Sequence, residues 1–441
     1  MKALNDRPAL FAALALAITS LGSTQVATGQ PVTAYPPYTG KADKEIKVAR
    51  EYEEQFVRRG VRYADPELQA IIDRVGEGVL PVVADEFINF RFYLIRDPSP
   101  RVFSLADGQI YVHTGLLARL ENEAQLAAVL AHEVHHIAAH HHLETNKHRR
   151  SRNTVTGTVA LIFDDDDDPF SDTMEDIDPF HIARSEFSEE MEFEADEAAA
   201  MMIGGAGYSA AATVRALENM RKDPEVTIDG QSASFNSAES LLARQGRLQA
   251  LVDESPQLHG NRGLVETRPV QLRRVIEMTI DDYIRLNRPG AALKLVDSML
   301  AEQPDAFLYA AKGDAHLALG PRPVDIQQEF ATPIIVGRRA EKTRVEINAK
   351  YLEMEGGPER LAFNLESAAE AYNTAMQMDE NYARAYRGLG NLHYEQEEFR
   401  PAGRNYVKYL KLETDSMDRQ FILERLQHIK TELTKQKEAG E

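Results

Sequence analysis

The sequence HEVHHIAAHH spans residues 132–141 and contains five of the thirteen histidines in this chain of 441 residues. Two of them, His132 and His136, are four positions apart. Residues with this spacing lie one turn apart on the same face of an α-helix. A helical tract would therefore direct both imidazoles to one point. The tract predicts a helix that carries a two-histidine metal site, to which other segments must bring further ligands.

Glu133 directly follows the first of these histidines. A carboxylate there lies beside the two imidazoles without easily joining them on one ion, which is the position of a general base that acts on water at a metal. We therefore predict that Glu133 is catalytic. His135 is rotated off the shared face and is expected to support the site or to lie at the surface. His140 and His141 continue past the site, too far along for direct ligation.

A third ligand is expected, because catalytic zinc usually has three protein ligands and one open position. The chain has no cysteine, so the ligand must be His, Asp or Glu. The sequence EFEAD at 192–196 offers Glu192 and Asp196, which are again four residues apart on a predicted helix. One can bind the metal while the other orients a ligand histidine. Taken alone, the segment is also typical of an acidic, solvated helix face.

The segments around these motifs predict an α+β domain, mostly helical with a small sheet. Alternating apolar residues in INFRFYLIRD, residues 88–97, indicate a strand. RVFSLADGQIYVHTG, residues 101–115, indicates two short strands around a turn at Asp107-Gly108. Helices are expected over 121–144, which contains the histidines, and over 185–203, which contains EFEAD. An earlier helix should start at Pro66 with Asp65 as its N-cap.

The first 44 residues differ from the rest of the chain. Lys2 and Arg7 precede an apolar run at 9–18, and small residues follow it. This pattern predicts a cleaved signal peptide over residues 1–29, followed by a linker over residues 30–44 that is rich in proline and small residues. An uncleaved anchor helix is the alternative. No later segment approaches the ~20 apolar residues of a membrane helix, so we expect a protein that is exported to the periplasm without a transmembrane segment.

Small and aromatic residues recur after 34 positions near the C-terminus. The recurring pairs are Ala368 and Ala402, Tyr372 and Tyr406, and Ala375 and Tyr409. A period of 34 residues is typical of tetratricopeptide repeats, in which aromatic side chains fill the gaps left by small residues between two helices. We predict an all-α tetratricopeptide-repeat solenoid over residues 265–441, which binds partners. Generic amphipathic helices are the alternative.

The net charge of the chain limits the classes of partner that it is expected to bind. Seventy acidic and fifty basic residues give a net charge of −20. A nucleic-acid partner is not expected, because phosphate binding needs a basic face. Nine carboxylates lie within residues 164–178 and basic residues lie within 147–152. A solvated loop is the simplest interpretation of the acidic segment, and a salt-sensitive lid over the metal site is the alternative hypothesis.

The sequence DGQIYVHTGLLARLENEAQLAAVLAHEVHHIAAHH at 107–141, followed by FEAD, resembles the HtpX/BepA-type zinc metallopeptidases, relatives of the CaaX prenyl proteases. The resemblance covers roughly residues 45–255. It implies a zincin-like metallopeptidase domain, to which we give the bounds 45–260, and one Zn²⁺ per chain. By this resemblance the zinc ligands are His132, His136 and Glu192, the general base is Glu133, and Asp196 is the carboxylate that orients a ligand histidine.

The resemblance also implies a function. The expected protein is a periplasmic zinc metalloendopeptidase that cleaves protein or peptide substrates in envelope protein quality control. Its repeat domain would bind protein partners, the outer-membrane assembly machinery among them.

Two positions depart from the family pattern. Ser188-Glu189 stands where Ser-Arg is usual, and SFNSAESLLARQGRL, residues 234–248, lacks the histidine of a His-Pro pair. Arg247 is the candidate for the arginine of the family in this region. These departures leave open a non-catalytic chaperone or scaffold with a structural or vestigial zinc site.

Overall fold

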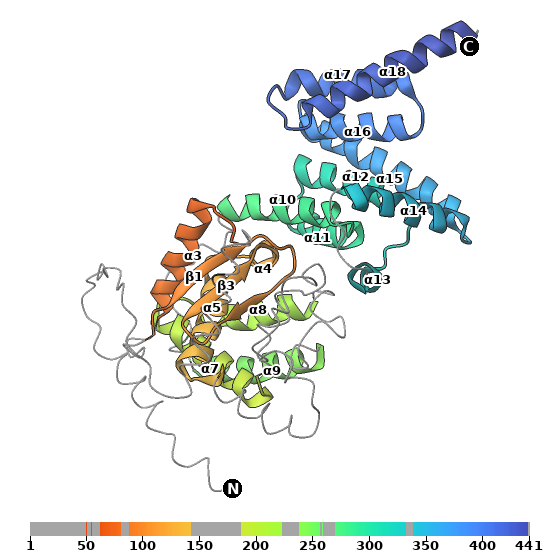
Figure 1. The fold of residues 1–441 in the computed structure, drawn as a ribbon. Coiled ribbons are helices and arrows are strands. Elements are labelled where there is room, and N and C mark those ends of the chain that lie inside the picture. Colours follow the sequence, from red (N-terminus) through yellow and green to blue (C-terminus); the bar gives the residue numbers. More distant parts are fainter. Residues whose placement is uncertain are drawn as a thin grey trace, which may run out of the picture. The chain divides into compact units, whose positions relative to one another are not determined.

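The computed structural model has two compact units, Met1–Val275 and Ile276–Glu441, and the chain passes from one to the other within helix α10, Val270–Arg285 (Figure 1). The predicted signal peptide, the linker and the acidic segment 164–178 lie outside the described residues. The structure describes Arg50, Glu54, 62–80, 88–142, 187–222, 238–255, Leu258, 270–331 and 338–439.

The first unit contains a three-stranded sheet in the order β1-β3-β2. Strand β3, Gln109–His113, is buried along its whole length and pairs parallel with β1, Arg91–Ile95, and antiparallel with β2, Val102–Ser104. Gly108 in the turn before β3 has φ +101°, and a Cβ there would lie 2.5 Å from the carbonyl oxygen of Asn89. Only glycine suits this turn. The predicted small sheet is confirmed.

Helices α3, Pro66–Val79, and α5, Glu123–Ala138, pack against each other and against the sheet (Figure 1). The predicted cap of α3 is present, because Asp65 Oδ1 accepts a hydrogen bond from the amide of Leu68 at 3.2 Å. Asn122 caps α5 in the same way. The almost entirely buried surface of α5 explains its apolar sequence before the histidines.

The histidine helix is shorter than the predicted 121–144. It ends at Ala138, and His140 has φ +56°, a left-handed conformation through which an α-helix does not continue. The chain then turns so that His141 and His142 are buried. The sequence has no glycine or proline at this point. Because the usual residues that end a helix are absent, the sequence pattern predicted a helix longer than the one observed.

Helix α7, Glu189–Gly205, packs along α5 and carries the EFEAD motif. It is covered by α8, Ala211–Lys222, and α9, Ala238–Glu254. Small side chains of α7 let these helices approach closely, and the core between them is apolar. It contains Ala200, Ala210, Val214, Leu217, Leu241, Leu248, Val252 and Leu258. The short helix α4, Thr114–Arg119, follows β3 directly.

The second unit is helical throughout its described part. Tyr372 fills a gap between helices, because a Cβ added at Gly313 or Gly388 would lie 2.5 or 2.1 Å from its ring. Tyr406 packs on Gly390 in the same way. The helices are α11 Pro289–Glu302, α12 Ala306–Leu319, α13 Ile326–Ala331, α14 Arg338–Glu353, α15 Gly357–Met378, α16 Ala383–Glu395, α17 Phe399–Leu412 and α18 Arg419–Ala439.

Within the described ranges, none of the helices combines the length and the apolar character that a membrane crossing requires.

Candidate active site

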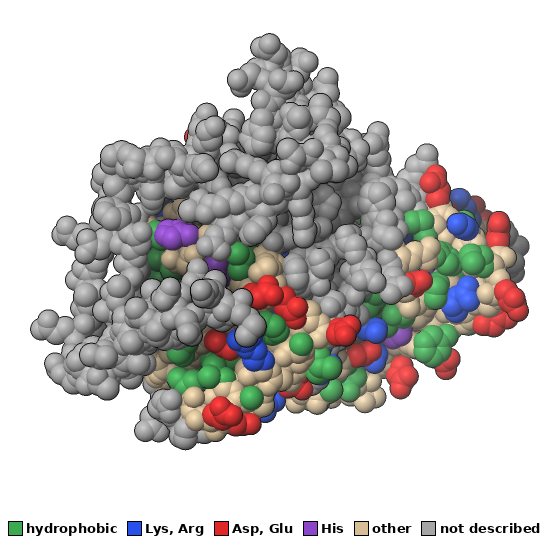
Figure 2. Space-filling view, turned by 90° about the horizontal axis from the view of Figure 1, so that it is seen from below, with side chains coloured by type: hydrophobic (Ala, Val, Ile, Leu, Met, Phe, Trp, Pro, Cys, Tyr) green, Lys and Arg blue, Asp and Glu red, His purple; other side chains and the backbone are tan. Residues whose placement is uncertain are grey.

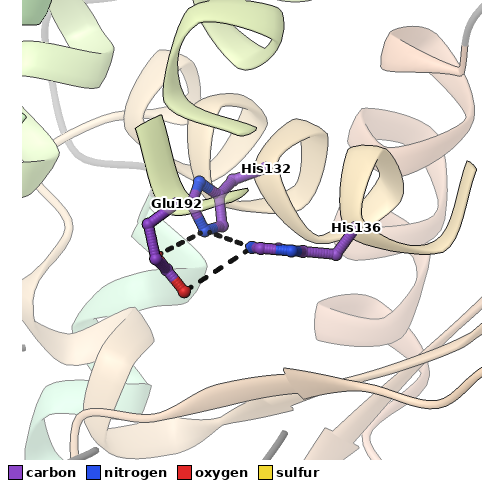
Figure 3. A group of neighbouring side chains, drawn as sticks. All are labelled: His132, His136 and Glu192. Atoms are coloured by element: carbon purple, nitrogen blue, oxygen red, sulfur yellow. Dashed lines mark hydrogen bonds and ion pairs between the residues drawn. The ribbon is translucent and has the colours of Figure 1, made fainter. Parts of the chain in front are cut away.

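Three side chains from α5 and α7 point toward one another (Figure 3). His132 Nε2 lies 3.0 Å from His136 Nε2 and 3.4 Å from Glu192 Oε2. Glu192 Oε1 lies 3.8 Å from His136 Nε2. The spacing of four residues on α5 brings the histidines together, and the packing of α7 against α5 adds the carboxylate. The structure thus brings together the three predicted ligands.

The geometry of these three residues fits a zinc ion. Zinc bonds of 2.0–2.1 Å in a tetrahedral site place neighbouring ligand atoms about 3.3 Å apart. Burial and the neighbouring histidines hold the pKa of His136 well below its ordinary value, so its ring is neutral, as a ligand must be. Burial alone would lower the pKa of His132, but the carboxylates of Asp196 and Glu192 outweigh it and raise that pKa to about 10. The cluster therefore attracts positive charge, either a proton or a metal ion.

Glu133 lies beside the cluster and is buried. Its Oε2 accepts a hydrogen bond of 2.7 Å from Ser104 Oγ on strand β2, and the same hydroxyl lies 3.2 Å from His142 Nε2. Burial raises the pKa of Glu133, although the positive charge of His132 opposes the change. The contact with Ser104 was not predicted, because 29 residues separate the two side chains in the sequence.

Asp196 contacts His132, the first of the predicted zinc ligands. Its Oδ1 lies 3.0 Å from His132 Nδ1, on the side of the ring opposite to the ligand nitrogen. Burial would raise the pKa of Asp196, but Arg244 on α9 lowers it to about 2. The guanidinium of Arg244 donates to both oxygens of Asp196 at 2.7 and 2.8 Å and lies 2.9 Å from Glu192 Oε2. Arg244 therefore fixes two of the predicted site residues at once.

Arg244, and not the candidate Arg247, is the arginine that contacts the site residues. The Arg247 side chain is 52% exposed, pairs with Glu197 at 2.8 Å and stacks on Phe193. The two arginines are three residues apart on one helix, so their sequence positions alone do not decide which of them faces α7.

Residues 65–280, about half of the chain, match the sequence model of peptidase family M48. This part of the chain belongs to peptidase family M48. The match includes both motifs and every side chain of the site described above.

Individual relatives match shorter stretches of this M48 chain. A putative beta-barrel assembly-enhancing protease of Vibrio cholerae is 30% identical over 92 residues, which cover 21% of this chain and 19% of the relative. The mitochondrial metalloendopeptidase OMA1 of Schizosaccharomyces pombe is 32% identical over 93 residues, 21% of this chain and 28% of the relative. OMA1 of Arabidopsis thaliana is 30% identical over 126 residues, 28% of this chain and 24% of the relative. The matches thus span less than a third of each relative.

Two further residues of the M48 site were not predicted. Phe187, just before α7, stacks on the His136 ring with a centroid distance of 3.8 Å and an angle of 12°. His141 Nδ1 lies 2.9 Å from His136 Nδ1. Both contacts restrict the orientation of the His136 ring. Of the remaining histidines, His135 is half-buried beside Glu194, and His140 is exposed. Figure 2 shows histidine side chains that reach the surface of the molecule.

Proposed function

We propose that the chain is a zinc-dependent metalloendopeptidase that cleaves protein substrates. The observation that carries this proposal is the convergence of His132, His136 and Glu192, with the carboxylate of Glu133 beside them. These three ligands would hold the catalytic zinc. When bound, zinc supplies Lewis acidity, which polarises a peptide carbonyl and makes water easier to deprotonate.

Glu133 is the proton carrier in this proposal. Ser104 binds Glu133 Oε2 and leaves Oε1 to accept a proton from the attacking water. The water oxygen forms the new bond to the carbonyl carbon, and the carbon–nitrogen bond then breaks. Glu133 returns the proton to the leaving amine. The carboxylate thus ends the reaction as it began, ready for another cycle.

Asp196 and Arg244 position the ligands. Asp196 accepts the Nδ1 proton of His132, which leaves the Nε2 lone pair directed at the metal position. Arg244 balances the charge of both carboxylates in a buried environment, where an unpaired carboxylate would be costly. Neither residue needs to touch the substrate.

We propose that the substrate binds in an extended conformation along β2. This strand lies at the edge of the described sheet, and its Ser104 contacts the proposed base. An added strand would gain main-chain hydrogen bonds without demanding a particular sequence. Such binding suits a peptidase that acts on unfolded segments.

We propose that the second unit binds protein partners and that the chain acts in outer-membrane assembly. The 34-residue recurrence and the aromatic packing on Gly313, Gly388 and Gly390 support a tetratricopeptide-repeat domain that binds partners. The matched relatives named as beta-barrel assembly-enhancing proteases support a role in outer-membrane assembly and envelope quality control. The predicted signal peptide supports a periplasmic location.

Glu133→Gln tests the peptidase proposal. The variant should keep wild-type zinc content and lose at least ~100-fold in casein cleavage, because general base catalysis contributes about 10²–10⁴-fold. Glu190→Gln, on an exposed position of α7, is the matched control and should cleave normally. Wild-type cleavage by Glu133→Gln would contradict the mechanism. Wild-type protein that binds zinc and partners but cleaves nothing would favour the scaffold alternative.

A further inference from the structure

A second group of metal-binding side chains lies next to the proposed catalytic site. It comprises His135 on α5, His141 just after α5, and Glu194 on α7, and one ligand atom of each lies within 4.8 Å of the others. His135 Nε2 is 3.5 Å from Glu194 Oε1, and His141 Nε2 is 3.8 Å from Glu194 Oε2. The proposed hydrolysis uses none of these three residues.

We propose that His135, His141 and Glu194 form a second site for a divalent cation. Their donor set, two imidazoles and a carboxylate, is the same as that of the first cluster. The distances of 3.5 and 3.8 Å are close to the spacing of about 3.3 Å expected between ligands of one tetrahedral ion. His135 Nε2 is also buried without a hydrogen-bond partner. A buried polar atom of this kind is costly, and a bound cation would satisfy it.

The ligands indicate which ion would bind. Imidazole nitrogens suit zinc and other first-row transition metals, whereas calcium and magnesium prefer oxygen ligands. The Glu194 side chain is 32% exposed, while that of His141 is 4% exposed. The site is therefore open to solvent on the carboxylate side. An ion there could exchange with the surroundings more readily than one at the more buried first cluster.

The two clusters share a contact through which a cation bound at one should weaken cation binding at the other. His136 Nδ1 and His141 Nδ1 lie 2.9 Å apart, so a hydrogen bond between them needs one proton only. A neutral imidazole that binds a cation through Nε2 carries its proton on Nδ1. Two occupied sites would therefore turn two N–H groups toward each other. We expect the second ion to bind more weakly than the first.

Equilibrium dialysis of the full chain against rising free zinc tests the proposal. The wild-type protein should bind two equivalents, with the second at a free zinc concentration at least tenfold higher than the first. Glu194→Gln and His135→Ala should each bind one. His140→Asn is the matched control, because this exposed neighbour lies outside both clusters, and it should bind two. Circular dichroism melting curves check that the variants are folded.

The outcomes separate this proposal from the peptidase proposal. Glu133→Gln should bind two equivalents even though it is inactive, because it removes no ligand from either cluster. A wild-type protein that saturates at one equivalent would overturn the second site, as would two equivalents in both Glu194→Gln and His135→Ala. Glu194→Gln is nearly isosteric at a partly exposed position, so it remains informative if His135→Ala does not fold.

Discussion

Each compact unit contains an arginine that binds two carboxylates, but only one of these arginines borders a candidate site. Arg244 in the first unit lies 2.9 Å from Glu192 and 2.7 Å from Asp196. Arg384 in the second unit lies 2.5 Å from Asp281 and 2.7 Å from Asp314. In both units, one arginine is paired with two carboxylates. The two arrangements differ in the other side chains that contact these carboxylates.

Near Arg244, His132 contacts both carboxylates of the pair. Near Arg384, the hydroxyl of Tyr372 donates to Asp314 at 2.7 Å. An imidazole can exchange its proton for a metal ion, whereas a tyrosine hydroxyl whose pKa is raised by burial only satisfies the carboxylate. A buried ion pair alone therefore indicates side chains that are held in fixed positions. An imidazole beside such a pair indicates a candidate metal site.

The largest effect is expected when a proposed zinc ligand near Arg244 is removed, because the arrangement near Arg384 contains no such ligand. Glu192→Ala should lower the affinity for the first zinc by roughly a hundredfold or more and abolish measurable peptide cleavage, since even partners of ligands contribute 10–100-fold. Isothermal titration with zinc and a peptide cleavage assay measure both effects. Glu190→Ala, an exposed acid on the same helix, is the control. Unchanged zinc affinity in Glu192→Ala would remove Glu192 from the ligand set.

A matched pair of arginine variants tests the comparison directly. Arg244→Met should reduce zinc affinity and peptide cleavage by about 10–100-fold, because it releases Glu192 and Asp196 from their fixed positions. Arg384→Met should leave both within about twofold of wild type. Each variant should lose stability, by about 3–5 kcal/mol where the broken pair is fully buried. Equal effects of both variants on zinc affinity would show that Arg244 has no specific role.

Ser104→Ala should have a smaller effect. It removes one hydrogen bond to Glu133, and such a bond to a charged group contributes about 1.5–3 kcal/mol. We expect kcat to fall by roughly tenfold or more, with KM and zinc content unchanged. Ser104→Thr retains the hydroxyl and should recover most of the activity. A loss that appears in KM instead would place Ser104 in substrate binding and not in the positioning of Glu133.

The sequence predicted the parts of the site that depend on local spacing. His132 and His136 belong to one helix, as do Glu192 and Asp196, and the helical period alone places each pair on one face. The residues that it missed act across long separations. Arg244 reaches Asp196 over 48 positions, and Ser104 reaches Glu133 over 29. No periodic pattern marks such a contact, because it depends on how the helices and the sheet pack together.

The position of His141 shows the same limit on a smaller scale. A continuous helix would have carried it one turn further from the metal position. The left-handed backbone at His140 ends the helix and returns His141 to His136. A non-glycine residue rarely takes this conformation. The sequence therefore favoured a longer helix, and the second cluster could not be predicted from it.

The smallest expected effect concerns a histidine far from both clusters in sequence. His316 on α12 is 6% exposed, and its Nδ1 lies 2.9 Å from Asn364 Oδ1. Burial lowers its pKa from the ordinary 6.5, although the hydrogen bond to Asn364 opposes this change. The unfolded chain therefore takes up a proton at this residue more readily than the folded chain. Its contribution to stability is complete above about pH 6.5 and is lost as the pH falls through the lower folded pKa.

His316→Asn should reduce this pH dependence, because asparagine can donate to Asn364 but does not titrate. Urea unfolding followed by circular dichroism at pH 7.5, 6.5 and 5.5 measures the effect, with the pH values chosen around the ordinary pKa of about 6.5. The asparagine variant should be less stable than wild type at pH 7.5, since it fills less of the buried space. The stability difference between the two proteins should narrow toward pH 5.5. A stability difference that stays constant from pH 7.5 to pH 5.5 would show that the unfolded chain takes up no more protons at His316 than the folded chain does. The comparison of the two units would then rest on their arginines alone.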